Sequence, residues 1–410
     1  MMVQLSFNAI IKTIAFIFGK VIALITIPLI SNALGIELYG KYNHLLTIAG
    51  YGLVLINWGF LAKGIREIAS NNKKTVDVVH EIISTRVVLW LVSTATLIII
   101  TTTVYQNIDA LILIVLALVA NLGQALNLDF YFYAKKNTVI PSIARLMGQI
   151  LFLTLLLLFV ESSSDIYYLF FFLILFQFSE TLINYLFSKG ILSIRKISLN
   201  FKKSFGVLKS NFYLGFGAKT SFLTFSIPIL LIPYFYSNEV LGAYMIAYKI
   251  FLLMMGVFSI GTLVLSPFIV KYLQEKDDKI ISILRLAVLG FLSVGLLGGS
   301  IVYVLHDYLI DYFFESEFKS ANQYFFSFMY VLVPIWGIYT CTVIFLNNMI
   351  LDRLYSIVSF IQLIIIGIFT PILMHFELLI YSIYLIAVIT FISSMVYLKI
   401  ITNKLKTKTY

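Results

Sequence analysis

Long apolar runs restrict what this sequence can fold into more than any other feature. Ala15–Ile30, Val87–Thr103, Ile108–Leu128 and Leu286–Leu305 each approach or exceed the roughly 18 residues that mark a membrane-spanning helix. Hydrophobic residues make up 61% of the chain and charged residues 12%. Because so few polar side chains could not cover a soluble globule, the sequence predicts an all-α, polytopic membrane protein.

The apolar windows predict about twelve transmembrane helices. They lie near residues 8–33, 42–62, 86–105, 109–133, 139–160, 166–188, 212–236, 240–270, 280–304, 324–348, 354–374 and 377–398. No stretch that is long and polar enough for a separate soluble domain remains between them.

Basic residues outside these spans lie almost entirely on one side. With the N-terminus in the cytoplasm, the cytoplasmic connections collect nearly all of them, and the opposite side holds Lys41 and Lys319. Since basic residues favour cytoplasmic loops, we expect both termini in the cytoplasm. The net charge of +10 then points to anionic lipid headgroups as partners, and no nucleic acid is expected.

Metal and disulfide chemistry find little support in the sequence. Cys341 is the single cysteine and lies in an apolar run, so no intrachain disulfide can form. The histidines are scattered without metal-ligand spacing, at His44, His80, His306 and His375. We therefore expect no metal site and no cofactor.

The chain repeats itself at an offset of about 200 residues, which indicates two similar halves. The segment 26–30 (TIPLI) is echoed by 226–230 (SIPIL), and 37–42 (ELYGKY) is echoed by 239–244 (EVLGAY). We expect a six-helix bundle over 1–188, a basic cytoplasmic linker over 189–211, a second six-helix bundle over 212–398 and a basic cytoplasmic tail over 399–410. The linker contains no Asp or Glu, and it is alternatively an interfacial amphipathic helix on anionic lipid.

Four lysines fall inside predicted spans: Lys12, Lys20, Lys219 and Lys249. A lysine near the centre of a lipid-facing helix costs roughly 2.5–3.5 kcal/mol, so we expect most of them to face a wet cavity. On the first helix, Lys12 shares one face with small residues, and Lys20 lies at the rim of that face. Lys12 is also near enough to the helix end to reach the headgroups instead. A basic cavity suggests an anionic substrate with an apolar tail.

Two acidic residues, Asp129 and Glu180, also fall within spans, near their cytoplasmic ends. Two roles stay open for them. Either residue can pair with a buried lysine as structural support, or it can carry a coupling proton or Na⁺.

Three segments resemble Wzx-type polysaccharide flippases of the multidrug/oligosaccharidyl-lipid/polysaccharide (MOP) exporter superfamily. They are 34–42 (LGIELYGKY), 64–69 (GIREIA) with Arg66 and Glu67, and 128–134 (LDFYFYA). The aromatic at Phe130 departs from the family, which more often has tryptophan there. The resemblance extends over nearly the whole chain in length, span count and two-half layout.

The resemblance implies movement of undecaprenyl-diphosphate-linked oligosaccharide (O-antigen and similar repeat units) across the bacterial inner membrane by alternating access. On this view Lys12, Lys20, Lys219 and Lys249 bind the diphosphate, and Arg66 and Glu67 belong to a motif in a cytoplasmic loop. The resemblance further implies coupling to H⁺ or Na⁺, and a polysaccharide polymerase and chain-length machinery as partners.

Two other functions are weighed against the flippase. A membrane polymerase or ligase would need a sizeable, basic outward loop, whereas the longest outward loop expected here, His306–Gln323, is short and net acidic. A MATE-like small-molecule exporter would carry more buried acids than buried lysines. The first contrast argues against an enzyme, and the second favours the flippase over the exporter.

Overall fold

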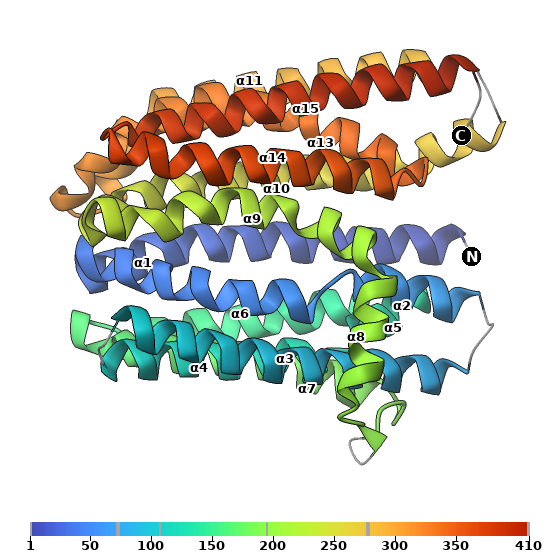
Figure 1. Ribbon diagram of the computed structural model, residues 1–410, viewed down its shortest axis with the longest axis horizontal. Helices are drawn as coiled ribbons and strands as arrows, with labels where there is room; N and C mark the ends of the chain where they lie inside the picture. The colour runs from blue at the N-terminus through green and yellow to red at the C-terminus, as the bar shows by residue number, and fades with distance from the viewer. Residues whose placement is uncertain (1, 71–73, 106–107, 194–195, 276–278, 408–410) are drawn as a thin grey trace. The chain divides into compact units, whose positions relative to one another are not determined.

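The computed structural model describes residues 2–70, 74–105, 108–193, 196–275 and 279–407. These residues form helices joined by short connections, with no strand among them (Figure 1). The chain divides into two compact units, Met1–Lys219 and Thr220–Tyr410. We refer to them as unit 1 and unit 2.

Unit 1 contains the first eight α-helices and the first turns of the ninth. Their bounds are α1 Met2–Ile56, α2 Phe60–Ala69, α3 Thr75–Tyr105, α4 Ile108–Leu126, α5 Asp129–Ala134, α6 Val139–Phe159, α7 Ile166–Phe187, α8 Phe201–Ser210 and α9 Phe212–Phe235, with a 3₁₀ turn η1 at Ser163–Asp165.

Helix α1 is interrupted at Gly35, where φ is 73° and ψ is 165°. This backbone conformation is essentially restricted to glycine. Figure 1 shows that the chain turns back on itself after the first arm of α1. The connection expected between spans 8–33 and 42–62 is therefore a break at a single glycine within α1.

Unit 2 continues α9 and adds six further helices and two short helical segments. They are α10 Asn238–Glu275, α11 Lys279–Phe313, η3 Ser316–Ala321, α12 Asn322–Phe325, η4 Phe326–Leu332, α13 Val333–Asn348, α14 Asp352–His375 and α15 Leu379–Thr407. η4 is a stretch of π-helix. Its Phe328 packs against Tyr244 and Phe251 of α10, with ring centroids 5.2 and 5.5 Å apart, and these buried rings form part of the core of unit 2.

Ten helices in the described part of the chain are long and apolar enough to cross a membrane, and Phe222–Phe235 is a shorter apolar helix. The predicted all-α membrane fold is confirmed. Each predicted span overlaps a described helix, and the spans 42–62 and 109–133 each cross a break between two helices. The count of twelve spans and the two six-helix bundles stay predictions.

Three details differ from the expectation, and a fourth concerns the linker, for which a helix was one of the two alternatives. Helix α3 begins at Thr75, about three turns before the predicted residue 86. Helix α11 continues to Phe313, so much of the outward loop expected at His306–Gln323 is helical. The expected linker contains α8, and α15 continues through the expected tail as far as Thr407, beyond which residues 408–410 lie outside the described chain.

Candidate functional site

A charged cavity of about 270 Å³ lies within unit 1. Four helices contribute side chains to it: α1, α5, α6 and α7. The lining residues are Lys12, Ala15, Phe16, Gly19, Lys20, Ala23, Asp129, Tyr133, Pro141, Ser142, Arg145, Gln149 and Glu180. The cavity thus collects both predicted lysines of α1 and both predicted acids, and the small residues of α1 form one of its walls.

Both lysines of the cavity contact aromatic rings. The Nζ of Lys12 lies 5.6 Å from the ring centroid of Tyr133, and the Nζ of Lys20 lies 5.5 Å from that of Phe16. An ammonium group within about 6 Å of a ring centroid is attracted by the ring's quadrupole. This attraction is weaker than that of an ion pair with a carboxylate. In the described chain no carboxylate lies within ion-pair distance of either lysine, so both ammonium groups keep their capacity to bind an anion.

Arg145 on α6 and Glu180 on α7 form an ion pair at the cavity wall. Nη2 of Arg145 lies 3.6 Å from Oε1 of Glu180. The carboxylate is 2% exposed, whereas the guanidinium side chain is 58% exposed. A buried anion therefore holds a cation whose remaining N–H groups point to accessible space.

Asn127 lies in the break between α4 and α5, and its buried side chain forms a hydrogen bond with Glu180. Asn127 donates from Nδ2 to Oε1 of Glu180 at 3.0 Å, and its Oδ1 accepts from Nδ2 of Asn184 at 2.8 Å. The backbone N–H of Asp129 donates to the same Oδ1, and Nη1 of Arg86 donates to the carbonyl of Asn127, both at 3.0 Å. This network of buried hydrogen bonds therefore joins the helix break to one oxygen of the Glu180 carboxylate.

Asp129 stands at the first turn of α5, directly after the break. Its Oδ1 accepts the backbone N–H of Phe130 at 2.8 Å. Arg86, Arg145 and Lys219 are close enough to interact electrostatically with it. The carboxyl group of Asp129 therefore has basic neighbours from α3, α6 and α9.

The other predicted residues lie outside the cavity lining. Lys219 is half-buried in α9, near Arg86 as well as Asp129. Lys249 is half-buried in α10 of unit 2. Arg66 and Glu67, expected in a cytoplasmic loop, instead lie on helix α2. Glu67 pairs there with Lys63 at 3.0 Å, across one helical turn.

Sequence reasoning missed several lining residues, among them Tyr133, Arg145 and Gln149. Arg145 lies close to the start of its span, where a basic residue is expected on the cytoplasmic side. A signal was present, since Arg145 and Gln149 are four residues apart and share one face of a helix whose first turn contains Pro141. Gln149 comes so close to α1 that a Cβ at Gly19 would lie 2.5 Å from its Oε1.

The charge and shape of the cavity suit an anionic group. Three cations and two carboxylates line it, and one carboxylate is already engaged by Arg145. Among the described residues, no group of three or more His, Cys, Asp or Glu side chains could hold a metal ion. The cavity thus offers ammonium and guanidinium donors for phosphate or carboxylate oxygens.

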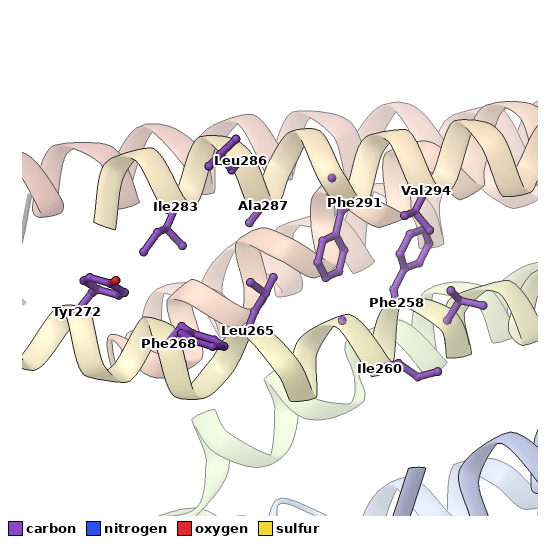
Figure 2. Close-up of a pocket in the computed structure, with 13 residues that line it drawn as sticks. Phe258, Ile260, Leu265, Phe268, Tyr272, Ile283, Leu286, Ala287, Phe291 and Val294 are labelled. Carbon is purple, nitrogen blue, oxygen red and sulfur yellow. The ribbon is translucent and has the colours of Figure 1, made fainter. Parts of the chain in front are cut away.

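A larger cavity of about 700 Å³ lies in unit 2 between α10 and α11 and has a different chemistry. Figure 2 shows aliphatic and aromatic side chains from both helices around it, including Leu265, Phe268 and Phe291. The hydroxyl of Tyr272 is the one polar side-chain group in the lining. This groove suits an apolar chain and provides no charge for a polar head.

A family model described as "Polysaccharide biosynthesis protein" matches residues 5–273. The chain belongs to this family. None of the curated protein sequences matches it.

Solved structures of membrane transporters share the fold of this polysaccharide biosynthesis family member. The lipid II flippase MurJ in an inward closed conformation has a TM-score of 0.70 at 13% identity, over 96% of this chain and 87% of that one. The Vibrio cholerae MATE transporter VcmN has a TM-score of 0.65 at 15% identity, over 99% and 98%. An outward-facing MATE family transporter of the MOP superfamily has a TM-score of 0.66 at 12% identity, over 98% and 96%. The chain is thus a multi-pass membrane protein with the fold of MOP-superfamily transporters, as its resemblance to the Wzx type predicted.

Proposed function

We propose that this protein is a flippase that carries undecaprenyl-diphosphate-linked oligosaccharide repeat units across the bacterial inner membrane by alternating access. The observation that carries the proposal is the presence of Lys12, Lys20 and Arg145 around one cavity between apolar helices. Membership of the polysaccharide biosynthesis family supports a substrate of this class. The shared fold with a lipid II flippase supports the mode of action.

The cations of the cavity would neutralise the diphosphate while the polyprenyl tail stays in lipid. Lysine offers a compact charge that accommodates varied oxygen positions, and arginine offers a planar pair of donors that fits phosphate oxygens. Glu180 orients Arg145 without burying it, so Arg145 can contact a ligand and Glu180 acts by positioning it. We propose Lys219 and Lys249 as further contacts of the diphosphate along its path.

Transport in this proposal is coupled to an ion gradient. Asp129 and Glu180 are the carboxylates that line the cavity. Protonation of either, or Na⁺ bound at either, would change the balance between cations and anions at the diphosphate site. Release of the substrate on one side of the membrane would then be linked to uptake of the ion.

The proposal includes an arrangement in the membrane. Both termini lie in the cytoplasm, and the bundles over 1–188 and 212–398 move relative to one another about the basic linker. The protein is not an enzyme and works beside the polymerase and the chain-length machinery that use the delivered repeat units. The distribution of basic residues supports this orientation.

Two alternatives are less well supported. A polymerase or ligase would need a basic outward segment for two diphosphate substrates, whereas residues 306–323 are acidic and largely helical. A small-molecule exporter of the MATE type would favour cationic drugs, whereas the cavity of unit 1 has an excess of cations.

The test is complementation of a strain that lacks its own flippase for the same substrate. The variants Lys20→Gln, Lys12→Gln and Arg145→Gln are compared with Lys20→Arg and Lys12→Arg, and lipid-linked oligosaccharide in each leaflet is measured. We expect the neutral variants to accumulate the substrate in the cytoplasmic leaflet, and the arginine variants to retain most of the transport.

Lys319→Gln is the matched control, because Lys319 is 61% exposed and pairs with Asp311 at 3.0 Å. Full transport by a Lys12→Gln/Lys20→Gln/Arg145→Gln triple variant that is present at normal abundance would overturn the proposal. Normal transport with a failure to polymerise the delivered units would instead favour the enzyme alternative.

A further inference from the structure

Helix α8 lies against the flank of unit 1 and exposes aromatic and basic side chains together. Phe201 and Phe205 are each 48% exposed, and Lys202 and Lys209 are exposed beside them. Spacings of four and seven residues place each pair on one side of the helix. We call these four residues the outer face of α8.

The opposite side of α8 is packed against unit 1. Ser204 and Val207 are buried, and α8 contacts α3. Lys203 extends from the packed side to Glu81 of α3, with 3.7 Å between Nζ and Oε2. The helix begins at Asn200, whose side chain accepts the backbone N–H of Lys203 at 2.9 Å, which is a strong helix start signal.

The segment before α8 is fixed to the same helix. The backbone N–H of Ser198 donates to Oγ of Ser84 at 3.0 Å, and that of Ser193 donates to Nε2 of His80 at 3.1 Å. Nδ1 of His80 faces the carbonyl of Val76 at 2.7 Å. These contacts hold α8 at one level of α3, among its first, polar turns.

The direction of α8 differs from that of the spanning helices. Figure 1 shows α8 running across α3, α4 and the other long helices of unit 1. Since those helices cross the membrane, the axis of α8 lies along the membrane plane. The outer face is therefore turned away from the bundle, beside the polar first turns of α3.

All charged residues in the stretch of sequence that contains α8 are basic. The stretch 189–211 contains no Asp or Glu, and its basic residues are Lys189, Arg195, Lys196, Lys202, Lys203 and Lys209. Exposed apolar residues continue on both sides of α8, with Leu199 at 55% and Phe212 at 46%. Aromatic side chains beside lysines are typical of a helix that lies in a membrane interface.

We infer that the outer face of α8 binds the headgroups of anionic phospholipids in the leaflet that holds the linker. Phe201 and Phe205 would insert among the upper acyl chains, and Lys202 and Lys209 would contact the phosphates. The lipid charge would then set how firmly α8 is held on α3. This inference concerns a surface outside the cavity and does not depend on the transported substrate.

The experiment measures hydrogen–deuterium exchange of the full-length protein in nanodiscs. One membrane is phosphatidylcholine alone, and the other contains a third phosphatidylglycerol. We expect backbone amides of 201–210 to be protected roughly tenfold more in the anionic membrane, because each lysine near such a surface adds to the attraction. High salt should remove most of that difference, since exposed charges are screened.

Variants separate lipid binding from packing. Lys202→Gln/Lys209→Gln should abolish the lipid dependence, whereas Lys203→Gln should lower protection equally in both membranes, because Lys203 faces Glu81. Gly206→Ala serves as a helix-stability control. A Cβ there would meet no atom within 4 Å. Gly206→Ala should therefore raise the protection of 201–210 by the same factor in both membranes, because alanine favours a helix more than glycine does.

Equal protection of 201–210 in the two membranes would overturn the inference. So would a lipid dependence that survives in Lys202→Gln/Lys209→Gln, or protection that appears only when a soluble protein partner is added. Phe201→Ser/Phe205→Ser should lower protection in both membranes, and an unchanged value would show that the rings are not in lipid.

Discussion

Glu180 on α7 holds Arg145 on α6 by an ion pair of 3.6 Å, and the two partners differ sharply in environment. The carboxylate is enclosed by the polar network around Asn127, whereas the guanidinium faces the cavity. A charge that is buried in this way is kept because its surroundings pair it. The arrangement explains how an acid can line a basic cavity without cancelling the whole of its charge.

Replacing Glu180 should affect stability and transport separately. In Glu180→Ala the amide of Asn127 loses its acceptor, so we expect a loss of roughly 1–3 kcal/mol of stability. Glu180→Gln keeps an oxygen at that position and should be nearer to wild type. Thermal unfolding in detergent checks the first effect. If Glu180→Gln has normal stability but flips less substrate, the negative charge of Glu180 is needed to position Arg145, in addition to its hydrogen bond with Asn127. Equal unfolding midpoints for both variants would contradict the role assigned to the network.

Two glycines with positive φ allow a matched test of the corner between α1 and α2. Gly59 has φ 68° and Gly190 has φ 73°. A Cβ at Gly59 would lie 2.9 Å from the backbone nitrogen of Gly215, whereas one at Gly190 would meet nothing within 4 Å. Both Ala variants carry the left-handed strain of roughly 1–2 kcal/mol, and only Gly59→Ala adds a backbone clash. We expect a clearly lower unfolding midpoint for Gly59→Ala than for Gly190→Ala; similar midpoints would contradict it.

Much of the fold could be predicted from apolar windows alone, because a membrane leaves helices as the simplest way to satisfy each backbone group. Local breaks were harder to predict. The window method treats residues 8–33 and 42–62 as separate spans but does not find the single-residue break at Gly35. It also starts the third span at residue 86, because His80 and Glu81 lower the hydropathy of turns that are nevertheless helical.

The candidate site was only partly predictable for a related reason. Lys12 and Lys20 stood out because lysine is rare inside a span. Arg145 did not stand out, because it lies within the second turn of α6, where a basic residue fits a cytoplasmic helix end. Its place in the cavity depends on the pairing with Glu180, which is a contact between different helices. Composition and periodicity report on single helices, so contacts of this kind could not be predicted from them.

A second glycine pair tests packing inside unit 2. On α11, a Cβ at Gly299 would collide with the carbonyl oxygen of Met329 in the π-helical stretch, whereas one at Gly290 would meet nothing within 4 Å. Gly299→Ala should therefore cost roughly 1–3 kcal/mol, the usual cost of overpacking. Gly290→Ala should be neutral or stabilising by up to about 1 kcal/mol through helix propensity. Thermal unfolding of the two variants checks the prediction, and a stable Gly299→Ala would contradict the close approach.

Glu81 joins three helices, which makes a last prediction possible about the linker. Its Oε1 lies 3.4 Å from Nζ of Lys63 on α2, and its Oε2 lies 3.7 Å from Nζ of Lys203 on α8. In Glu81→Gln both attractions are lost at once. Lys63 still pairs with Glu67 at 3.0 Å, so the loss of stability falls mainly on the contact between α8 and α3. We expect a loss of about 1 kcal/mol in the docking of α8, which is ordinary for partly exposed ion pairs.

A loss of that size should raise the open population of the linker roughly fivefold, and limited proteolysis reports that population when reclosing is fast. Trypsin cleavage within 196–209 should therefore accelerate about fivefold in Glu81→Gln. Lys63→Gln is the control, because it removes one partner of Glu81 but leaves the contact with Lys203 in place, and cleavage should stay close to wild type. If both variants were cleaved equally fast, the ion pair between Glu81 and Lys203 would not be what holds α8 on α3.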